Sequence, residues 1–217
     1  MILIGVDTGG TFTDLVAQDG QGRIRVHKVL STPDNPARAV LKGLEELPSD
    51  FRGAGRIVHG STVATNALLE RKGARTALIT TAGFEDVLEI GRQTRPNLYD
   101  LTGRRSPPLV SRDLRFGLNE RILYDGQVER EPDPEEITGL LARIEQAGVE
   151  SLAVCLLHSY ANPAHEETLR RRAETLGIPV SVSHRIFNEF REYERTSTTV
   201  VNAYVAPVMR RYLGDLG

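Results

Sequence analysis

The sequence predicts an α/β fold built on a mixed sheet with helices on both faces. Three short apolar segments, at 2–6, 12–18 and 23–29, are joined by the tight polar turns DTGG and DGQGR, as in consecutive antiparallel strands. After them, segments with helical spacing alternate with apolar runs of strand length, which is the pattern of helices packed on a sheet. The first turn also directs the search for a site, because it carries two acids, two glycines and three threonines.

The next elements follow from capping signals and apolar spacing. Asn35 is the expected N-cap of a helix with Pro36 at its first position, and Pro48 follows its end. The segment RIVHGST predicts a strand, TNALLERKG a helix that ends near Gly73, and TALITTAG a further strand. Three strands, helix, strand, helix, strand is the order of an RNase H-like layer, which we therefore expect.

The second half of the chain continues the alternation after an irregular stretch. Residues 92–118 are rich in Arg and Pro without a clean period, which is typical of a functional or disordered loop. A hairpin around Asp125-Gly126, helices capped at Asp133 and Asn162, and strands in SLAVCLLHS and PVSVSHRI follow. The last segment keeps helical spacing, and Pro207 is expected to kink it or to start a second helix. We expect one domain over 1–187, with 92–118 as an insertion, and the helical start of a following, truncated domain over 188–217.

Composition excludes some classes of function. The formal net charge of −2 gives no electrostatic reason to expect a nucleic acid or an anionic membrane as partner. No apolar run approaches the ~20 residues of a membrane span, and the apolar N-terminal segment has no basic leader. The single cysteine, Cys155, lies in an apolar run and is expected to be a buried small hydrophobe. A cytoplasmic location is the expectation.

The stretch DTGGTFTD is the first candidate site. A strand that ends in Asp7, turns through Gly9-Gly10 and returns antiparallel gathers backbone N–H groups that suit phosphate oxygens. Asp7 is placed to hold Mg²⁺ through water, because magnesium favours one or two carboxylates and keeps its waters. The cofactor-binding set is Asp7, Thr8, Gly9, Gly10, Thr11, Thr13 and Asp14. The alternative is a plain hairpin in which the glycines supply positive φ and the acids are merely solvated. Neither a Walker P-loop nor a Rossmann fingerprint is present.

A second candidate lies at a strand-to-helix junction. Gly60, Ser61 and Thr62 precede a helix whose free N–H groups would suit a phosphate or a polarised carbonyl. Ordinary capping by Ser61 or Thr62, with Asn66 facing solvent, explains the same residues equally well. From the residues alone, both interpretations stay open.

Five segments, in order along the chain, resemble the hydantoinase A / 5-oxoprolinase family, which includes the acetone carboxylase β subunit. They are DTGGTFTD at 7–14, HGSTVATNALLERKGA at 59–74, ALITTAGFEDVLEIGRQTRPNLYDL at 77–101, LLHSYANPAHE at 156–166 and REYERTSTTVVNAYVAPVM at 191–209. The resemblance implies an actin-like ATPase fold. Members are much longer than 217 residues and use ATP to activate a cyclic amide for hydrolysis or a ketone for carboxylation.

The resemblance also implies roles for residues. It favours a site at the second junction, with Asp7, His59 and Thr62 as catalytic residues and His59 as acid/base or hydrogen-bond donor. Gly60, Ser61, Thr62, Asn66 and Arg92 would face the substrate, although charged loops such as the one around Arg92 are more often simply solvated. ATP and Mg²⁺ are the implied cofactors. The missing C-terminal part of the enzyme, or a B-type partner subunit, would complete an oligomeric enzyme.

Three alternatives to a cyclic-amide hydrolase stay open. An acetone carboxylase β-type enzyme would share the ATPase half and differ in its acceptor. A sugar kinase would release a stable phosphorylated alcohol. A nucleotide-sensing module would bind phosphate without chemistry, and fold alone does not choose among these.

Overall fold

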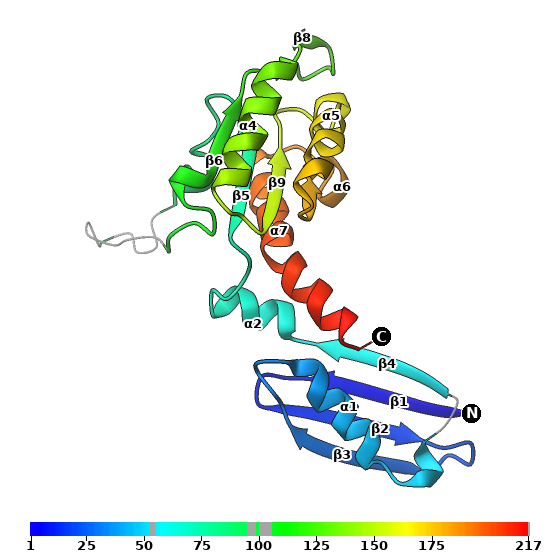
Figure 1. Cartoon of the computed structure of the whole chain (residues 1–217). Coiled ribbons are helices and arrows are strands. Elements are labelled where there is room, and N and C mark those ends of the chain that lie inside the picture. The colour runs from blue at the N-terminus through cyan, green and yellow to red at the C-terminus, as the bar shows by residue number, and fades with distance from the viewer. Residues whose placement is uncertain (53–54, 95–98, 100–105, 217) are drawn as a thin grey trace. The chain divides into compact units, whose positions relative to one another are not determined.

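The computed structural model describes residues 1–52, 55–94, 99 and 106–216 (Figure 1). The chain forms two compact units, the first made of residues 1–72 and 208–217 and the second of residues 73–207. This division differs from the expected boundary at residue 188, because residues from the C-terminal end of the chain return to the first unit. Among the described residues, no helix has the length and apolar character that a membrane span requires.

The first unit contains a four-stranded mixed sheet. Its strands are β1 (Ile2–Thr8), β2 (Phe12–Gln18), β3 (Ile24–Leu30) and β4 (Gly55–Ser61). They lie in the order β3-β2-β1-β4, with antiparallel pairing in the two hairpins and parallel pairing of β1 with β4. The three predicted N-terminal strands and the predicted strand over RIVHGST are thereby confirmed.

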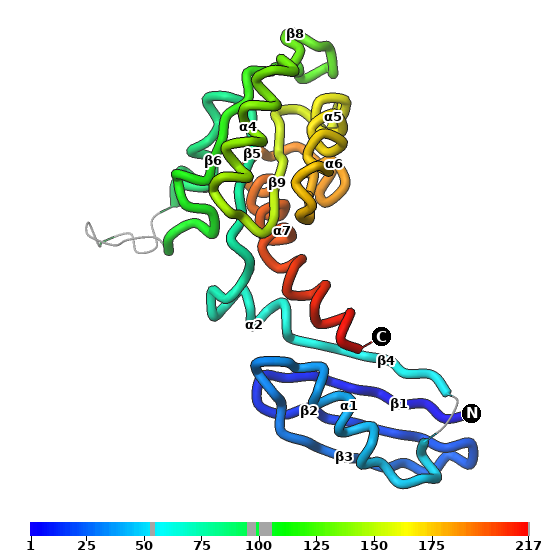
Figure 2. Tube along the Cα trace, viewed as in Figure 1, coloured from blue at the N-terminus to red at the C-terminus, as the bar shows by residue number. Residues whose placement is uncertain are grey.

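One face of this sheet is covered by a helix. Figure 2 traces the chain from β3 into α1 (Pro36–Glu46), which packs on β2 and β3 and precedes a 3₁₀ turn, η1 (Ser49–Phe51). Asn35 caps α1 by accepting from the Ala37 N–H, as its position before Pro36 predicts. Ile4, Val6, Leu15, Ala17, Val40 and Leu47 are buried in the core beneath it. The short helix α2 (Val63–Leu69) follows β4 and ends before the predicted Gly73.

The second unit is built on a separate, all-parallel sheet. Its strands are β5 (Thr76–Thr81), β6 (Arg115–Leu118), β9 (Ser151–Cys155) and β10 (Val180–Val182), in the order β10-β9-β5-β6. The expectation that β5 would extend the first sheet into one RNase H-like layer is therefore wrong: β5 pairs with β6 and β9. Every residue of β5 and β9 is buried, as in a parallel sheet covered on both faces.

Helices cover both faces of the second sheet. They are α3 (Val87–Ile90), α4 (Pro134–Gln146), α5 (Ala164–Ala173), α6 (Ser183–Ile186) and α7 (Glu192–Gly214), with a 3₁₀ turn, η3 (Glu174–Leu176), after α5. Arg143 of α4 stacks on Phe116 of β6, and Thr196 of α7 donates to the Cys155 sulfur on the other face. Helices on both faces are thus found in this unit, whereas the described helices of the first unit cover one face of its sheet.

Two local predictions need adjustment. The stretch 92–118, expected to be irregular, contains the 3₁₀ turn η2 (Arg112–Leu114) and the strand β6; Arg95, Arg104 and Arg105 lie outside the described residues. The hairpin at Asp125-Gly126 forms as predicted from β7 (Arg121–Ile122) and β8 (Val128–Arg130), with Gly126 at φ +86°. Helix α7 continues through Pro207 as one element, so no second helix begins there.

Candidate functional site

The turn between β1 and β2 is held in place by a set of internal hydrogen bonds. Within the turn, the Gly9 N–H donates to the Phe12 carbonyl at 3.0 Å. Ser31, at the end of β3, donates its hydroxyl to the Gly9 carbonyl at 2.8 Å and its backbone N–H to the Thr11 carbonyl at 3.0 Å. Ser31 was not singled out by the sequence, and it fixes the carbonyls on both sides of Gly10.

The same turn is tied to the strand-to-helix junction after β4. The backbone N–H and the hydroxyl of Thr62 both donate to the Thr8 carbonyl, at 3.0 and 3.2 Å. Asn66, one turn further along α2, donates to the Thr62 hydroxyl oxygen at 3.3 Å. The structure thereby brings the two sequence-predicted segments together.

The backbone N–H groups of Gly10 and Thr11 make no hydrogen bond to any residue that the structure describes. Both residues are exposed at the tip of the turn. The tip of the turn thus has two adjacent free backbone donors, while the carbonyls of Thr8, Gly9, Thr11 and Phe12 each accept a hydrogen bond.

Gly9 and Gly10 do not adopt positive φ, unlike Gly22, Gly83 and Gly126. The alternative in which the two glycines serve only to supply that conformation is therefore wrong. Glycine at these two positions leaves room for neighbouring atoms. A Cβ at Gly10 would lie 3.2 Å from the Asn66 Nδ2, and a Cβ at Gly9 would lie 3.0 Å from the Phe12 carbonyl oxygen.

The alternation of side chains along the hairpin separates the predicted phosphate ligands. Thr8 and Thr13 point into the core, where Thr13 shares a hydrogen bond with the Ser31 hydroxyl and Thr8 accepts from the Tyr212 hydroxyl. Their hydroxyls are therefore not available to a ligand, contrary to the expectation that placed Thr8 and Thr13 in the cofactor-binding set. Thr11, at the tip, is exposed.

Asp7 and Asp14 lie directly opposite each other on the face of the sheet that α1 does not cover. Asp14 forms an ion pair with Lys28 at 2.8 Å, and Asp7 has no ion-pair partner within the described part of the chain. Gly60 is the neighbour of Asp7 on β4, and a Cβ there would lie 3.6 Å from the Asp7 Oδ1. Like charges directly opposite each other are unfavourable, and Lys28 offsets the charge of Asp14. No group of three or more potential metal ligands occurs among the described residues.

His59 lies on the opposite face of the sheet from these acids. Its side chain faces the core side of the sheet, where the Nε2 atom shares a hydrogen bond with the Tyr212 hydroxyl. Partial burial lowers the pKa of His59, and the charge of Asp7 works against that shift. The Ser61 hydroxyl accepts from the Val63 N–H, but the N-cap of α2 is Thr62, whose side chain makes no capping hydrogen bond, so the ordinary capping considered for these residues does not form.

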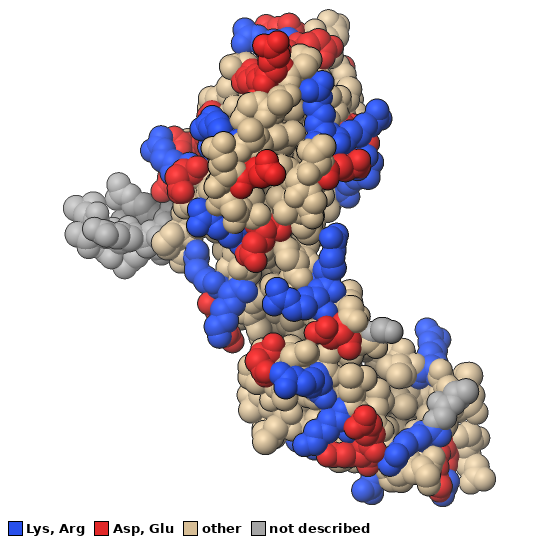
Figure 3. All heavy atoms as spheres, in the orientation of Figure 1, with Lys and Arg blue, Asp and Glu red and all other residues tan. Residues whose placement is uncertain are grey.

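A pocket of about 480 Å³ opens beside the turn. It lies within the first unit, between the Gly9-Gly10 tip, the β3–α1 connection, α2 and the end of α7. Lys72 and Arg211 contribute positive charge to its lining, and Asp34, Glu70 and Asp215 contribute negative charge. On the face shown in Figure 3, basic and acidic side chains are interspersed.

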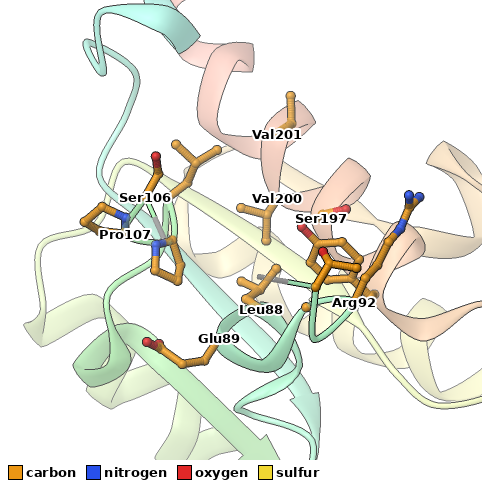
Figure 4. A pocket seen from close by; sticks show the side chains of 13 residues that line it. Leu88, Glu89, Arg92, Ser106, Pro107, Ser197, Val200 and Val201 are labelled. Carbon is orange, nitrogen blue, oxygen red and sulfur yellow. The ribbon is translucent and has the colours of Figure 1, made fainter. Parts of the chain in front are cut away.

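Arg92, the remaining predicted substrate contact, belongs to the second unit. It is exposed, forms an ion pair with Glu194 at 2.7 Å, and lines a pocket of about 950 Å³ with Leu88, Ser197 and Val200 (Figure 4). The described structure places Arg92 beside a carboxylate of its own chain.

A buried polar network at the carboxyl ends of β9 and β10 has no counterpart in the sequence-based prediction. Arg195, with no exposed surface, donates to the Ser159 and Ser183 hydroxyls, to the Leu156 carbonyl and to Glu192. Glu166 accepts from the Leu156 N–H at 2.9 Å and from His184 Nδ1 at 2.7 Å. Burial works to raise the pKa of Glu166, but hydrogen bonds from His184 and Ser183 hold that pKa below its usual value.

Comparison with known proteins connects this chain to larger enzymes. The profile of a family described as the hydantoinase/oxoprolinase N-terminal region matches residues 3–177. The chain is 36% identical over 222 residues to caprolactamase subunit alpha of Pseudomonas jessenii, which covers 97% of this chain and 32% of the subunit. It is 31% identical over 260 residues to the 5-oxoprolinase of Saccharomyces cerevisiae, covering 99% of this chain and 20% of that protein.

Two solved structures are similar along nearly the whole chain. The ATP-dependent caprolactamase from P. jessenii aligns with a TM-score of 0.86 at 36% identity, covering 98% of this chain and 32% of that one. Nucleotide-free acetone carboxylase aligns with a TM-score of 0.85 at 29% identity, covering 99% of this chain and 33% of that one. The chain thus spans about a third or less of the length of these relatives.

Proposed function

We propose that this chain, which belongs to the hydantoinase/oxoprolinase family, is the phosphate-binding N-terminal part of an ATP-dependent enzyme that hydrolyses a cyclic amide. The observation that carries the proposal is the β1–β2 turn, whose carbonyls are held by Ser31 and Thr62 while the N–H groups of Gly10 and Thr11 stay free. In this proposal the fold is the first part of an actin-like ATPase, and the rest of the enzyme completes the cleft.

The chemistry is a phosphoryl transfer followed by hydrolysis. The oxygen of the ring carbonyl attacks the γ-phosphorus of ATP, the bond to the β-phosphate oxygen breaks, and ADP leaves. One water then adds to the activated carbonyl carbon and the C–N bond opens, which leaves an acyl phosphate and a free amine. A second water adds to the acyl carbon, and the C–O bond to phosphate breaks to give the ring-opened acid and inorganic phosphate, which keeps the former ring-carbonyl oxygen. Transfers of this kind depend mainly on positioning and on charge stabilisation.

Five residues of the candidate site are assigned roles in this mechanism. Gly10 and Thr11 donate backbone N–H groups to phosphate oxygens, and Asn66 borders the same tip. Asp7 is the residue that would hold Mg²⁺ through water, which would neutralise phosphate charge. Because the structure holds His59 against Tyr212, we assign it to supporting the turn, and an acid/base role for it stays a prediction.

The test follows an isotope in the complete enzyme. With an amide substrate labelled with ¹⁸O at the ring carbonyl, phosphoryl transfer predicts that the label appears in inorganic phosphate. Absence of label in phosphate during ATP-dependent turnover would overturn the proposal.

A second function is favoured by the likeness to acetone carboxylase. The same phosphate turn would then activate a ketone for carboxylation. ATP consumption with acetone and bicarbonate, but not with hydantoins or lactams, would identify this alternative.

A further inference from the structure

One face of the first unit's sheet is apolar and uncovered. α1 packs on the side of Ile4, Val6 and Leu15, and no described helix of the first unit packs across the other side. The strand register places Val58, Val16 and Val26 in one row on that open side, through Gly5. The exposed fractions are 65% for Ile24, 64% for Val26, 70% for Leu30 and 53% for Val58. We call Leu3, Phe12, Val16, Ile24, Val26, Leu30 and Val58 the open face.

The β4 edge of the same sheet also has no neighbouring strand among the described residues. β4 pairs only with β1, and its seven-residue outer edge is unpaired by the described chain. Ile57 and Val58 are neighbours in sequence and therefore point to opposite sides of the sheet, yet both are more than half exposed. A strand that is apolar on both sides and paired in parallel is typical of a sheet interior, and a long unprotected edge is rare at a protein surface.

Polar and charged residues interrupt the open face. Asp7, Asp14 and Lys28 form a row across it, between the row of Val58, Val16 and Val26 and the pair Phe12–Leu30. At the other end, Arg56 and Gln18 share a row with Leu3 and Ile24. Exposed apolar side chains interspersed with polar ones are the make-up of a protein interface. The acids of this face do not suit an anionic lipid surface.

We infer that the open face and the β4 edge are the docking surface for the polypeptide that makes up the remaining two thirds of the longer enzyme. This chain covers only 32% of the caprolactamase subunit it resembles along almost its whole length, so that much polypeptide is available to cover the face. The docked segment supplies a strand beside β4 and apolar side chains over Val16 and Val26.

The docking also has a consequence for the site. The open face leads directly to Asp7 and Gly60, so the covering polypeptide would end beside the carboxylate proposed for Mg²⁺. The inference presumes the larger enzyme of the proposed function, but it is independent of whether that enzyme transfers phosphate.

Thiol labelling tests this directly. Val26→Cys places a reactive thiol on the open face, and Lys42→Cys places one on the outward side of α1 as a matched control. The natural Cys155 is buried, which raises the pKa of its thiol to about 11, so it reacts slowly. A maleimide is added, without nucleotide, to the 217-residue chain and to the complete enzyme, and peptide mass spectrometry assigns the label.

We expect both introduced thiols to react quickly in the 217-residue chain. In the complete enzyme, Val26→Cys should react at least about tenfold more slowly while Lys42→Cys is unchanged. Equal rates at Val26→Cys in the two proteins would overturn the inference. Slow labelling of Val26→Cys in the 217-residue chain that becomes fast on dilution would also overturn the inference. It would show that a second copy of this chain covers the open face.

Hydrogen exchange of the unsubstituted protein covers the case in which Val26→Cys prevents folding or assembly. Peptides over β4 should exchange markedly more slowly in the complete enzyme than in the 217-residue chain, and unchanged exchange would contradict the added strand. Neither measurement involves ATP, so a failure here is distinct from a failure of the ¹⁸O experiment.

Discussion

The Ser31 hydroxyl donates to the Gly9 carbonyl at 2.8 Å, and this bond joins the end of β3 to the turn between β1 and β2. The Ser31 oxygen also lies 3.0 Å from the hydroxyl of Thr13. One small side chain therefore determines where the backbone at Gly9 and Gly10 can lie. A binding turn fixed in this way needs little reorganisation when an anion arrives.

Removing this hydroxyl should loosen the turn. We expect Ser31→Ala to lower the free energy of unfolding by about 1 kcal/mol for each hydrogen bond lost, and to speed hydrogen exchange over residues 9–12. Urea denaturation and exchange mass spectrometry measure the two effects. Thr138→Ala, which removes an exposed hydroxyl on α4, is the control; equal exchange at the turn in both variants would show that Ser31 does not hold it.

Asp7→Ala should abolish binding of Mg·ATP to the chain, if the chain alone binds nucleotide, because the carboxylate proposed for Mg²⁺ is lost. Calorimetric titration measures this, with Asp50→Ala, another exposed acid of the first unit, as the control. Equal affinity of the two variants would exclude Asp7 from the site. If the unsubstituted chain binds nothing, the comparison is made in the complete enzyme.

Gly10→Ala should weaken nucleotide binding by about tenfold or more, corresponding to about 1.4 kcal/mol, because the new methyl group crowds Asn66 and the free N–H groups. Adding Asn66→Ala relieves the contact and should restore part of the affinity. Gly139→Ala, which has open space around it on α4, should leave binding unchanged. A Gly10→Ala protein that binds like the unsubstituted one would argue against the turn as a ligand site.

The buried Arg195 should be the most sensitive charged residue of the second unit. Arg195→Ala leaves Glu192 and the Ser159–Ser183 pair without their cation, and loss of one partner of a buried pair costs about 3–5 kcal/mol. Arg112→Ala, which removes an exposed arginine paired with Asp86, should cost less than about 1 kcal/mol. Chemical denaturation measures the free energy of unfolding of the two variants. Similar decreases in that free energy would show that the hydrogen bonds of Arg195 contribute no more than an exposed ion pair.

His165 predicts a pH dependence. Burial works to lower its pKa, but hydrogen bonds and charge from Glu120 and Glu131 outweigh this and raise the pKa above its usual value. A raised pKa contributes stability that is complete below the unfolded value of about 6.5 and is lost as pH rises through the folded value. The difference in unfolding free energy between the unsubstituted chain and His165→Gln should thus be larger at pH 5.5 than at pH 8.5. A difference independent of pH would show that His165 is not charged in the folded state.

Local features of the fold could be predicted from the sequence. Asn35-Pro36 and Asp133-Pro134 each begin a helix with the expected cap, because capping depends on neighbouring residues. The partners of β5 could not be predicted, since TALITT has the same apolar character whether it extends the first sheet or begins a second. The choice depends on pairing with residues 115–118 and 151–155, far along the chain.

Some features of the candidate site could be predicted from the sequence, and others could not. Thr62 donates to the Thr8 carbonyl, so the two separate segments singled out in the sequence lie side by side. Strict alternation along a hairpin was a signal that places Thr8 and Thr13 on the face opposite Asp7 and Asp14, and it could have excluded those hydroxyls as ligands. The contacts of Ser31 and Tyr212 depend on tertiary structure and had no such signal.

The return of residues 208–216 to the first unit affects the order in which the protein can be made. Tyr212 is buried against Thr8, 204 residues earlier, and Leu216 packs on the same core. At a synthesis rate of roughly 5–20 residues per second, the ribosome produces the strands of the first unit many seconds before residues 208–216, which pack on them. The first unit therefore gains this part of its core only after the whole second unit has been synthesised, and its nascent sheet keeps apolar surface exposed until then.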